Sequence, residues 1–181
     1  MRKGQQVSGV LVLGGVIVML IAAGGALAEE QMHTTPAGSA ELGRVKQLAG
    51  RWEGTSQETD KEAQPAVVEY KVTSGGSAVV ETLFPGTPHE MVSVYHDQRG
   101  KVAMTHYCML GNHPELALTK ASDNELDFSL AEGSDINSAK EQHMHALMLT
   151  QTDTDHLSQV WTCYEGGKPS NKVTIALSRV R

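Results

Sequence analysis

The segment THYCMLGNHPE, residues 105–115, concentrates side chains that can do chemistry. His106 and Cys108 are two positions apart, so they share one face if this segment is a β-strand. A catalytic thiolate needs a nearby base and electropositive surroundings, which makes a Cys–His nucleophile one interpretation of this spacing. The other interpretation is a strand that runs into a turn at 111–114, because Gly, Asn and Pro favour turns. Asn112 and His113 would then belong to the turn.

A second group of candidates centres on His143 and His145, which share a strand face and lie about 6–7 Å apart at Cα. This spacing suits zinc, copper or nickel if a neighbouring strand supplies a third ligand. The alternative is a hydrogen-bonded or solvent-facing histidine group without metal. A divalent metal or haem is thus a candidate cofactor. The candidates for the further ligand are His106, His96, His89 and Glu81.

The N-terminal segment indicates export. Arg2 and Lys3 precede an apolar run at 10–23, and Ala26-Leu27-Ala28 stands before Glu29. This is the layout of a secretory signal cleaved after residue 28, although residues 7–28 are also long enough to approach a membrane span. The Ala-x-Ala site and the polar switch favour cleavage. We therefore expect a periplasmic or secreted protein with no stable membrane insertion afterwards.

The remaining chain predicts one domain, 39–181, after a polar leader at 29–38. The net charge of −6 and the lack of a basic patch argue against nucleic acid as a partner. Oxidising conditions and two cysteines, Cys108 and Cys163, allow a disulfide if the two strands are neighbours. The oligomeric state is not determined by the sequence.

The periodicity predicts a short helix followed by strands only. Leu42, Val45 and Leu48 recur at helical spacing after Ser39, a good N-cap. After Gly50, short alternating runs are separated by Gly, Pro, Asn and Asp turns, which predicts an all-β, antiparallel up-and-down barrel of eight to ten strands. The runs are 51–57, 67–73, 78–84, 91–96, 101–109, 116–120, 125–130, 143–150, 157–164 and 172–179.

Strand alternation also predicts which side chains share a face. Glu81 is in phase with Val79 and Leu83, and His106 is in phase with Met104 and Cys108. By the same alternation, His143 and His145 share a face with Leu147 and Leu149, and Met91, Ser93 and Tyr95 share another. Trp52 and Trp161 are predicted core residues, and several methionines could form an adaptable apolar lining.

Two resemblances agree with this pattern. GRWEG at 50–54 resembles the Gly-x-Trp signature of lipocalins and other calycins, in which the Trp closes the barrel beneath a short helix. Residues 48–181 resemble a bacterial family of exported lipocalin-like proteins of unknown function. That resemblance implies a calycin-like barrel and no particular activity. The family has Gln in place of His113 and an apolar or aromatic residue in place of Cys163, which implies that Cys163 packs as a small hydrophobe. The matching segments are GGSAVVETLFPGTPHEMVSVYH, THYC with GNHP, HMH, WTCYEGGK and LSRVR.

The favoured hypothesis is an exported lipocalin-like protein that binds a small, partly apolar ligand in its barrel. The alternatives are a metal- or haem-binding barrel, with ligands drawn from His106, His143 and His145, and an enzyme with a His/Glu acid–base pair acting on a lipid-like substrate. An enzyme is the less favoured of these. The predicted ligand-binding residues are Glu81, His89, Tyr95, His96, His106, Cys108, Asn112, His143 and His145.

Overall fold

The computed structural model describes residues 38–181, which form one short helix and a closed antiparallel barrel of ten strands. The all-β barrel and its N-terminal helix confirm the predicted fold class. The predicted signal segment, 1–28, and nearly all of the leader lie outside the described residues. The elements are α1 (Ala40–Gln47), β1 (Gly50–Glu58), β2 (Gln64–Thr73), β3 (Ala78–Leu83), β4 (Met91–Gln98), β5 (Lys101–Tyr107), β6 (Glu115–Ala121), β7 (Glu125–Leu130), β8 (His143–Gln151), β9 (His156–Glu165) and β10 (Lys168–Arg179).

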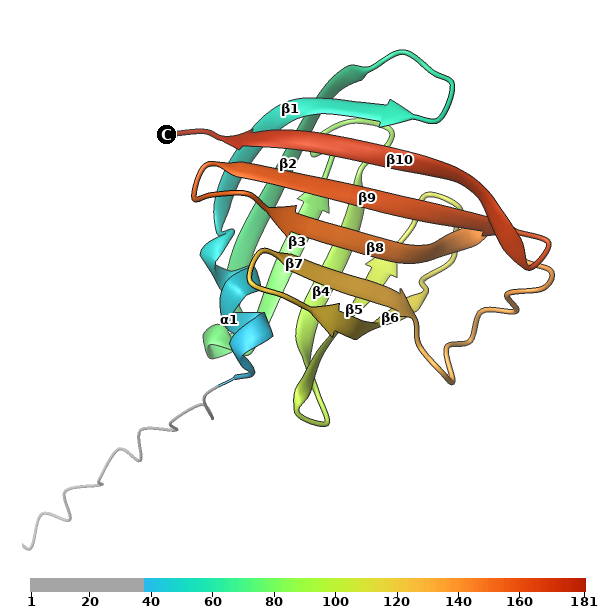
Figure 1. Cartoon of the computed structure of the whole chain (residues 1–181), viewed down its shortest axis with the longest axis horizontal. Coiled ribbons are helices and arrows are strands. Elements are labelled where there is room, and N and C mark those ends of the chain that lie inside the picture. The colour runs from blue at the N-terminus through green and yellow to red at the C-terminus, as the bar shows by residue number, and fades with distance from the viewer. Residues whose placement is uncertain (1–37) are drawn as a thin grey trace, which may run out of the picture. The chain divides into compact units, whose positions relative to one another are not determined.

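Each strand pairs with the next strand in the chain, and β1 closes the barrel against β10 (Figure 1). Tight turns make this meander possible, because two antiparallel strands need only a few residues to connect them. Closure leaves no unpaired sheet edge. Gly54 of β1 lies so close to the backbone of β10 that an added Cβ would sit 1.9 Å from the carbonyl oxygen of Ala176.

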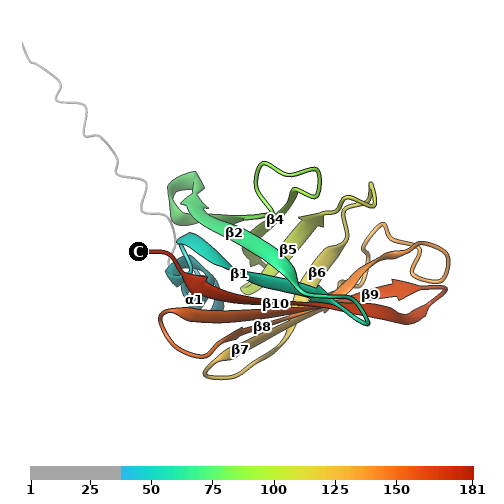
Figure 2. The ribbon, with the colours of Figure 1, turned by 90° about the horizontal axis from the view of Figure 1, so that it is seen from above.

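Helix α1 covers one end of the barrel, and hairpin loops lie at the other end (Figures 1 and 2). Ser39 caps the helix as predicted, because its Oγ accepts a hydrogen bond from the Leu42 N–H at 3.1 Å. The same Ser39 donates its backbone N–H to Asp97 of β4, which ties the helix to the barrel. Leu42 and Val45 are buried on the barrel side.

The covered end is packed with side chains. Trp52 of β1 is fully buried, and its indole N–H donates to the Leu48 carbonyl at 2.8 Å. The Arg179 guanidinium lies 4.2 Å from the Trp52 ring and donates to the carbonyl of Ala49 at the end of the helix. The predicted placement of this Trp in the core, beneath the helix, is therefore what the structure shows.

A β-bulge in β8 makes one face prediction wrong. The register of β8 against β9 shifts between Met144 and Ala146, so that two residues of β8 oppose one of β9. Leu147 and Leu149 point into the barrel, but after the phase change His143 faces the other side of the sheet, where it pairs with Tyr164 and is fully buried. Simple alternation counts every residue equally and therefore cannot detect the inserted one.

Among residues 38–181, no helix has the length and apolar character needed to span a membrane.

Candidate functional site

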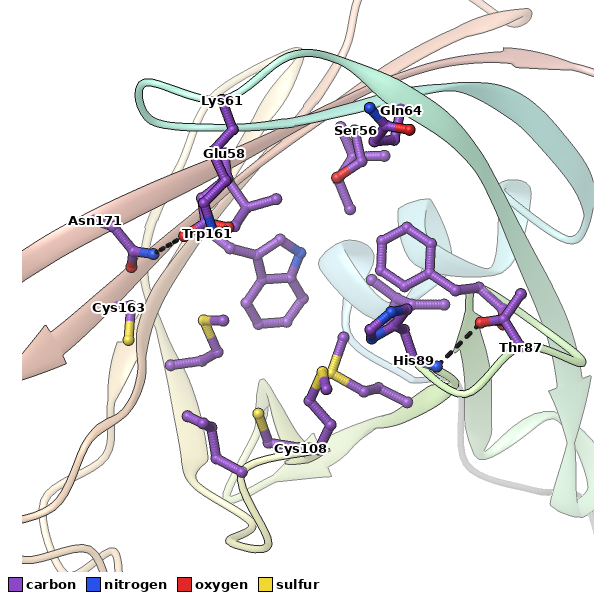
Figure 3. Close-up of a pocket in the computed structure, with 18 of the residues that line it drawn as sticks. Ser56, Glu58, Lys61, Gln64, Thr87, His89, Cys108, Trp161, Cys163 and Asn171 are labelled. Atoms are coloured by element: carbon purple, nitrogen blue, oxygen red, sulfur yellow. Dashed lines mark hydrogen bonds and ion pairs between the residues drawn. The ribbon is translucent and has the colours of Figure 1, made fainter.

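Side chains pack the barrel interior beneath α1 but leave a cavity at the other end. A cavity of about 510 Å³ opens at the end away from α1 (Figure 3). Its wall is mostly apolar and rich in sulfur, and Trp161 projects toward its middle. A volume in this range, with an apolar lining and a few polar groups, is typical of small-molecule sites. The apolar lining includes Leu83, Phe84, Met91, Cys108, Met109, Met144, Trp161, Cys163, Val173 and Ile175.

The rim of the cavity has charged side chains on one side and a residue with an unusual backbone conformation on another. Lys61 donates to Glu58 at 2.6 Å, and Asn171 donates its Nδ2 to the same carboxylate at 2.7 Å. Glu62 adds a second acidic group to this side. Phe84, where β3 ends, has φ = 54°, a backbone conformation that costs energy for a bulky side chain. The Phe84 side chain lines the cavity from this position.

Below the cavity, four neighbouring strands contribute one row of polar side chains. Tyr70 of β2 pairs with Glu81 of β3, Glu81 with Ser93 of β4, and Ser93 with His106 of β5. Because partners in register point to the same side of a sheet, all four side chains enter the barrel at one level. All four residues are buried. Strand register alone therefore brings together residues that are up to 36 positions apart in the chain.

Glu81 is the centre of this row. Its Oε1 accepts hydrogen bonds from Tyr70 at 2.7 Å and from the Gln159 amide, and its Oε2 accepts from Tyr95 at 2.9 Å. Burial raises the pKa of the Glu81 carboxyl above its ordinary value, while hydrogen bonds from Tyr70, Tyr95, Ser93 and Gln159 oppose this rise. Burial also raises the pKa of both tyrosines well above its usual range, so they remain protonated donors.

Gln159 joins the row from the opposite wall. Its Nε2 donates to Tyr70 at 2.6 Å as well as to Glu81, and its Oε1 accepts from the Trp161 indole at 2.8 Å. The amide orientation is fixed, because only the NH₂ end can donate to a carboxylate and only the oxygen can accept from an indole. Trp161 is therefore held rigidly at the cavity wall.

His106 is the polar-row residue that lines the cavity. Its Nδ1 lies 3.0 Å from the Ser93 hydroxyl, and its ring packs on Trp161 with centroids 4.6 Å apart. Its Nε2, on the ring edge away from Ser93, has no hydrogen-bond partner in the protein. Burial lowers the pKa of His106 from 6.5 to about 4, so the ring is neutral near pH 7.

The two thiols are free and do not form the disulfide that the sequence allowed. Cys108 and Cys163 both line the cavity, at separate places on its wall (Figure 3). Burial raises the pKa of the Cys108 thiol, which leaves it protonated and weakly nucleophilic. The spacing with His106 on one strand face therefore does not produce an activated thiolate.

His143 and His145 lie outside the cavity. The His143 Nδ1 donates to the Glu141 carbonyl at 2.7 Å, so its Nε2 is the acceptor of a 3.0 Å hydrogen bond from His145 Nδ1. His145 stacks on Tyr164 with centroids 3.6 Å apart. Within residues 38–181 no three His, Cys, Asp or Glu side chains are grouped to hold a metal ion, so His106 is not brought together with this pair. The two histidines are hydrogen-bonded to each other rather than arranged around a metal ion.

The other predicted residues divide between the rim, the interior and the outside. His89 is exposed at the rim of the cavity, where its backbone N–H donates to the Thr87 hydroxyl (Figure 3). Tyr95 belongs to the buried network beneath the cavity rather than to its lining. His96 is on the outer face of β4, because the interior face of that strand carries Ser93 and Tyr95. Asn112 links two loops by donating to the Gln142 carbonyl at 2.8 Å.

Several site residues were not predicted from the sequence. Ser93 and Tyr70 were placed in strands without a role, and Gln159 was not singled out. The signal was present in the alternation, since Gln159 stands between Leu157 and Trp161 on the inward face of β9. A polar residue in phase with buried apolar ones must find a partner inside the barrel.

Comparison with known proteins adds little. No family model and no curated protein sequence matches the chain. A solved structure of a redesigned beta barrel is similar at 12% sequence identity over 76% of this chain and 95% of that one, with a TM-score of 0.37. A likeness at that level carries no argument about function.

Proposed function

We propose that this protein binds a small, largely apolar molecule in the barrel cavity. The observation that carries the proposal is the uneven filling of the barrel: side chains pack the end beneath α1, whereas about 510 Å³ remains open at the other end. An open, mostly apolar volume of this size suits an apolar molecule, because binding removes apolar surface from water. The methionines in the wall suit an adaptable fit.

The setting proposed for this activity is outside the cytoplasm, after cleavage of the N-terminal signal. The sequence supports it through the basic, apolar and Ala-x-Ala pattern of residues 1–28. The resemblance to exported lipocalin-like proteins supports the same setting. We propose membership of that family on the motifs quoted above.

Binding fits the site chemistry better than catalysis does. A general base works best with a pKa near the working pH, but His106 has a pKa of about 4 and is buried. Burial raises the pKa of Cys108, which disfavours the thiolate that a nucleophile needs. Glu81 accepts several hydrogen bonds and does not line the cavity. His106 and Cys108 line the cavity and can contact a ligand, but all three groups are poorly suited to move protons.

Haem is the less favourable occupant. The neutral His106 Nε2 could ligate its iron, and His143 and His145 are excluded because they lie on the outer face. The haem propionates, however, would meet an acidic rim, where Lys61 is already paired with Glu58. We therefore treat haem as an outcome of the test: a His106-dependent Soret band on adding haemin would favour it over an organic apolar ligand.

The proposed function is tested with Nile red, a neutral apolar dye whose fluorescence rises when it leaves water. We expect saturable binding with one dye per chain. Met144 lines the cavity from β8, so Met144→Trp should fill the volume and weaken binding at least about tenfold. Met148, on the same strand, is 38% exposed, and Met148→Trp is the matched control that should leave binding unchanged.

Absence of saturable dye binding would contradict the proposal, and so would equal binding by the two tryptophan variants. Native mass spectrometry of the purified protein is an independent check. We expect a co-purified organic species in the wild type that is lost in Met144→Trp and kept in Met148→Trp.

A further inference from the structure

The geometry points to the chemical class of the ligand: we propose that it carries a neutral hydrogen-bond donor, such as an alcohol or phenol hydroxyl, which binds His106 Nε2. This inference rests on the proposed function and specifies what the cavity selects. His106 lines the cavity, and its Nε2 is buried without a partner, which costs free energy that a ligand can recover. A ligand hydroxyl would satisfy Nε2 at the inner end of the cavity.

The polar row leads us to assign Nε2 as an acceptor. Glu81 takes hydrogen bonds from Tyr70, Tyr95 and Gln159, and Ser93 stands between Glu81 and His106 in register. We assign the Ser93 hydrogen to the charged Glu81 carboxylate, a stronger acceptor than a neutral imidazole, so that Ser93 accepts from the Nδ1–H of His106. A neutral imidazole has one N–H, so the proton on Nδ1 leaves a lone pair on Nε2.

The charges around the row select against a carboxylate head group. His106 is neutral, and the residue two strands away in the same row is the acidic Glu81. None of the salt bridges recorded for residues 38–181 involves Glu81 or His106, so no cation there would compensate a second buried anion. Burying an unpaired carboxylate is expensive, and a fatty acid would have to do so.

A second orphan atom supports the same ligand class. Asn171 lines the cavity near the rim, and its Nδ2 donates to Glu58 at 2.7 Å. This contact fixes the amide orientation, because the oxygen end would be repelled by the carboxylate. The Asn171 Oδ1 is then a second buried acceptor without a partner. Among the cavity-lining residues described by the structure, the two unpaired buried polar atoms are His106 Nε2 and Asn171 Oδ1. With Nε2 assigned as above, both are acceptors that a ligand donor would satisfy.

The test uses three probes that share one alkyl chain: decanol, decyl methyl ether and decanoate. Their affinities are measured by isothermal titration calorimetry or by displacement of Nile red. We expect decanol to bind about tenfold more tightly than the ether, which can accept but not donate a hydrogen bond. Decanoate should bind at least about tenfold more weakly than decanol, because its charge must be desolvated beside Glu81.

Variants then assign the preference to His106. His106→Phe keeps a ring against Trp161 but removes the lone pair, so decanol and the ether should bind with nearly equal affinity. Ser93→Ala removes the group that fixes the ring proton on Nδ1, and should reduce the preference without reducing ether binding. His96→Phe, which changes a histidine on the outer face of β4, is the matched control and should retain the full preference.

The outcomes separate this inference from the proposed function. If the ether or decanoate binds as tightly as decanol, the cavity binds apolar molecules but the assigned donor preference is wrong. The same holds if the preference survives His106→Phe. If none of the three probes displaces Nile red, and Nile red itself does not bind, the proposed function fails and the inference fails with it.

Discussion

Acidification should destabilise this protein through His106, and the structure gives the size of the effect. The pKa of this ring is about 4 in the folded protein against 6.5 in the unfolded chain, because burial penalises the charged form. One unit of pKa difference corresponds to about 1.4 kcal/mol, so the full shift is worth about 3 kcal/mol. Between about pH 7 and about pH 4.5 the unfolded chain takes up the proton and the folded protein does not. We expect about 2 kcal/mol of the free energy of unfolding to be lost over that interval.

Urea denaturation of the wild type and of His106→Phe, followed at several pH values, isolates this contribution. The substitution shifts stability by a constant amount, but only the wild type contains the titrating ring, so the pH slopes should differ by about 2 kcal/mol over the interval. The raised pKa of Glu81 acts with the opposite sign, because protonation relieves its burial as the pH falls, and it is present in both proteins. Parallel slopes would refute the reasoning, as would an NMR titration of the wild-type His106 ring with a midpoint near 6.5.

Two further predictions concern the framework of the site. Gly54→Ala should destabilise by at least about 3 kcal/mol or prevent folding, because its Cβ would overlap the β10 backbone at 1.9 Å. In α1, a Cβ added at Gly43 meets nothing within 4 Å, so Gly43→Ala should instead raise the free energy of unfolding by about 0.5–1 kcal/mol. Thermal melts of both variants test the pair, and a mild loss of stability in Gly54→Ala would contradict the close approach of β1 and β10. Tyr95→Phe removes a hydrogen bond to Glu81 and should lower the free energy of unfolding, measured by urea denaturation, by about 1–3 kcal/mol. Tyr107→Phe, at a residue 52% exposed, is the control, and an equal loss in both would argue against the network.

Local pattern predicted most of the fold. The helix N-cap at Ser39 and all ten strands were expected from periodicity and turn residues, and their bounds differ mainly at the ends. Alternation also grouped Glu81 with Val79 and Leu83, and His106 with Met104 and Cys108, and all of these side chains are buried. These predictions succeed because side-chain direction in a regular strand depends only on position along that strand.

The site was predicted less well, for two physical reasons. The bulge in β8 changed the phase of His143 and His145 and moved them to the outer face. The polar row depends on register between strands, which no single strand encodes: Ser93 matters only because it pairs with both Glu81 and His106. Hydrogen-bond partners of Gln159 come from strands far away in the chain.

The sequence by itself therefore determined a helix-capped, all-β meander and which residues share a strand face, because periodicity and turn chemistry are local properties. Only the tertiary structure decided that one end of the barrel is filled and the other holds a cavity, since this depends on the summed volume of side chains from ten strands. The tertiary structure also decided the chemical state of His106 and Cys108 in the segment at 105–115. Pairing of the His106 Nδ1 with Ser93 leaves Nε2 buried without a partner, while burial leaves Cys108 as a thiol.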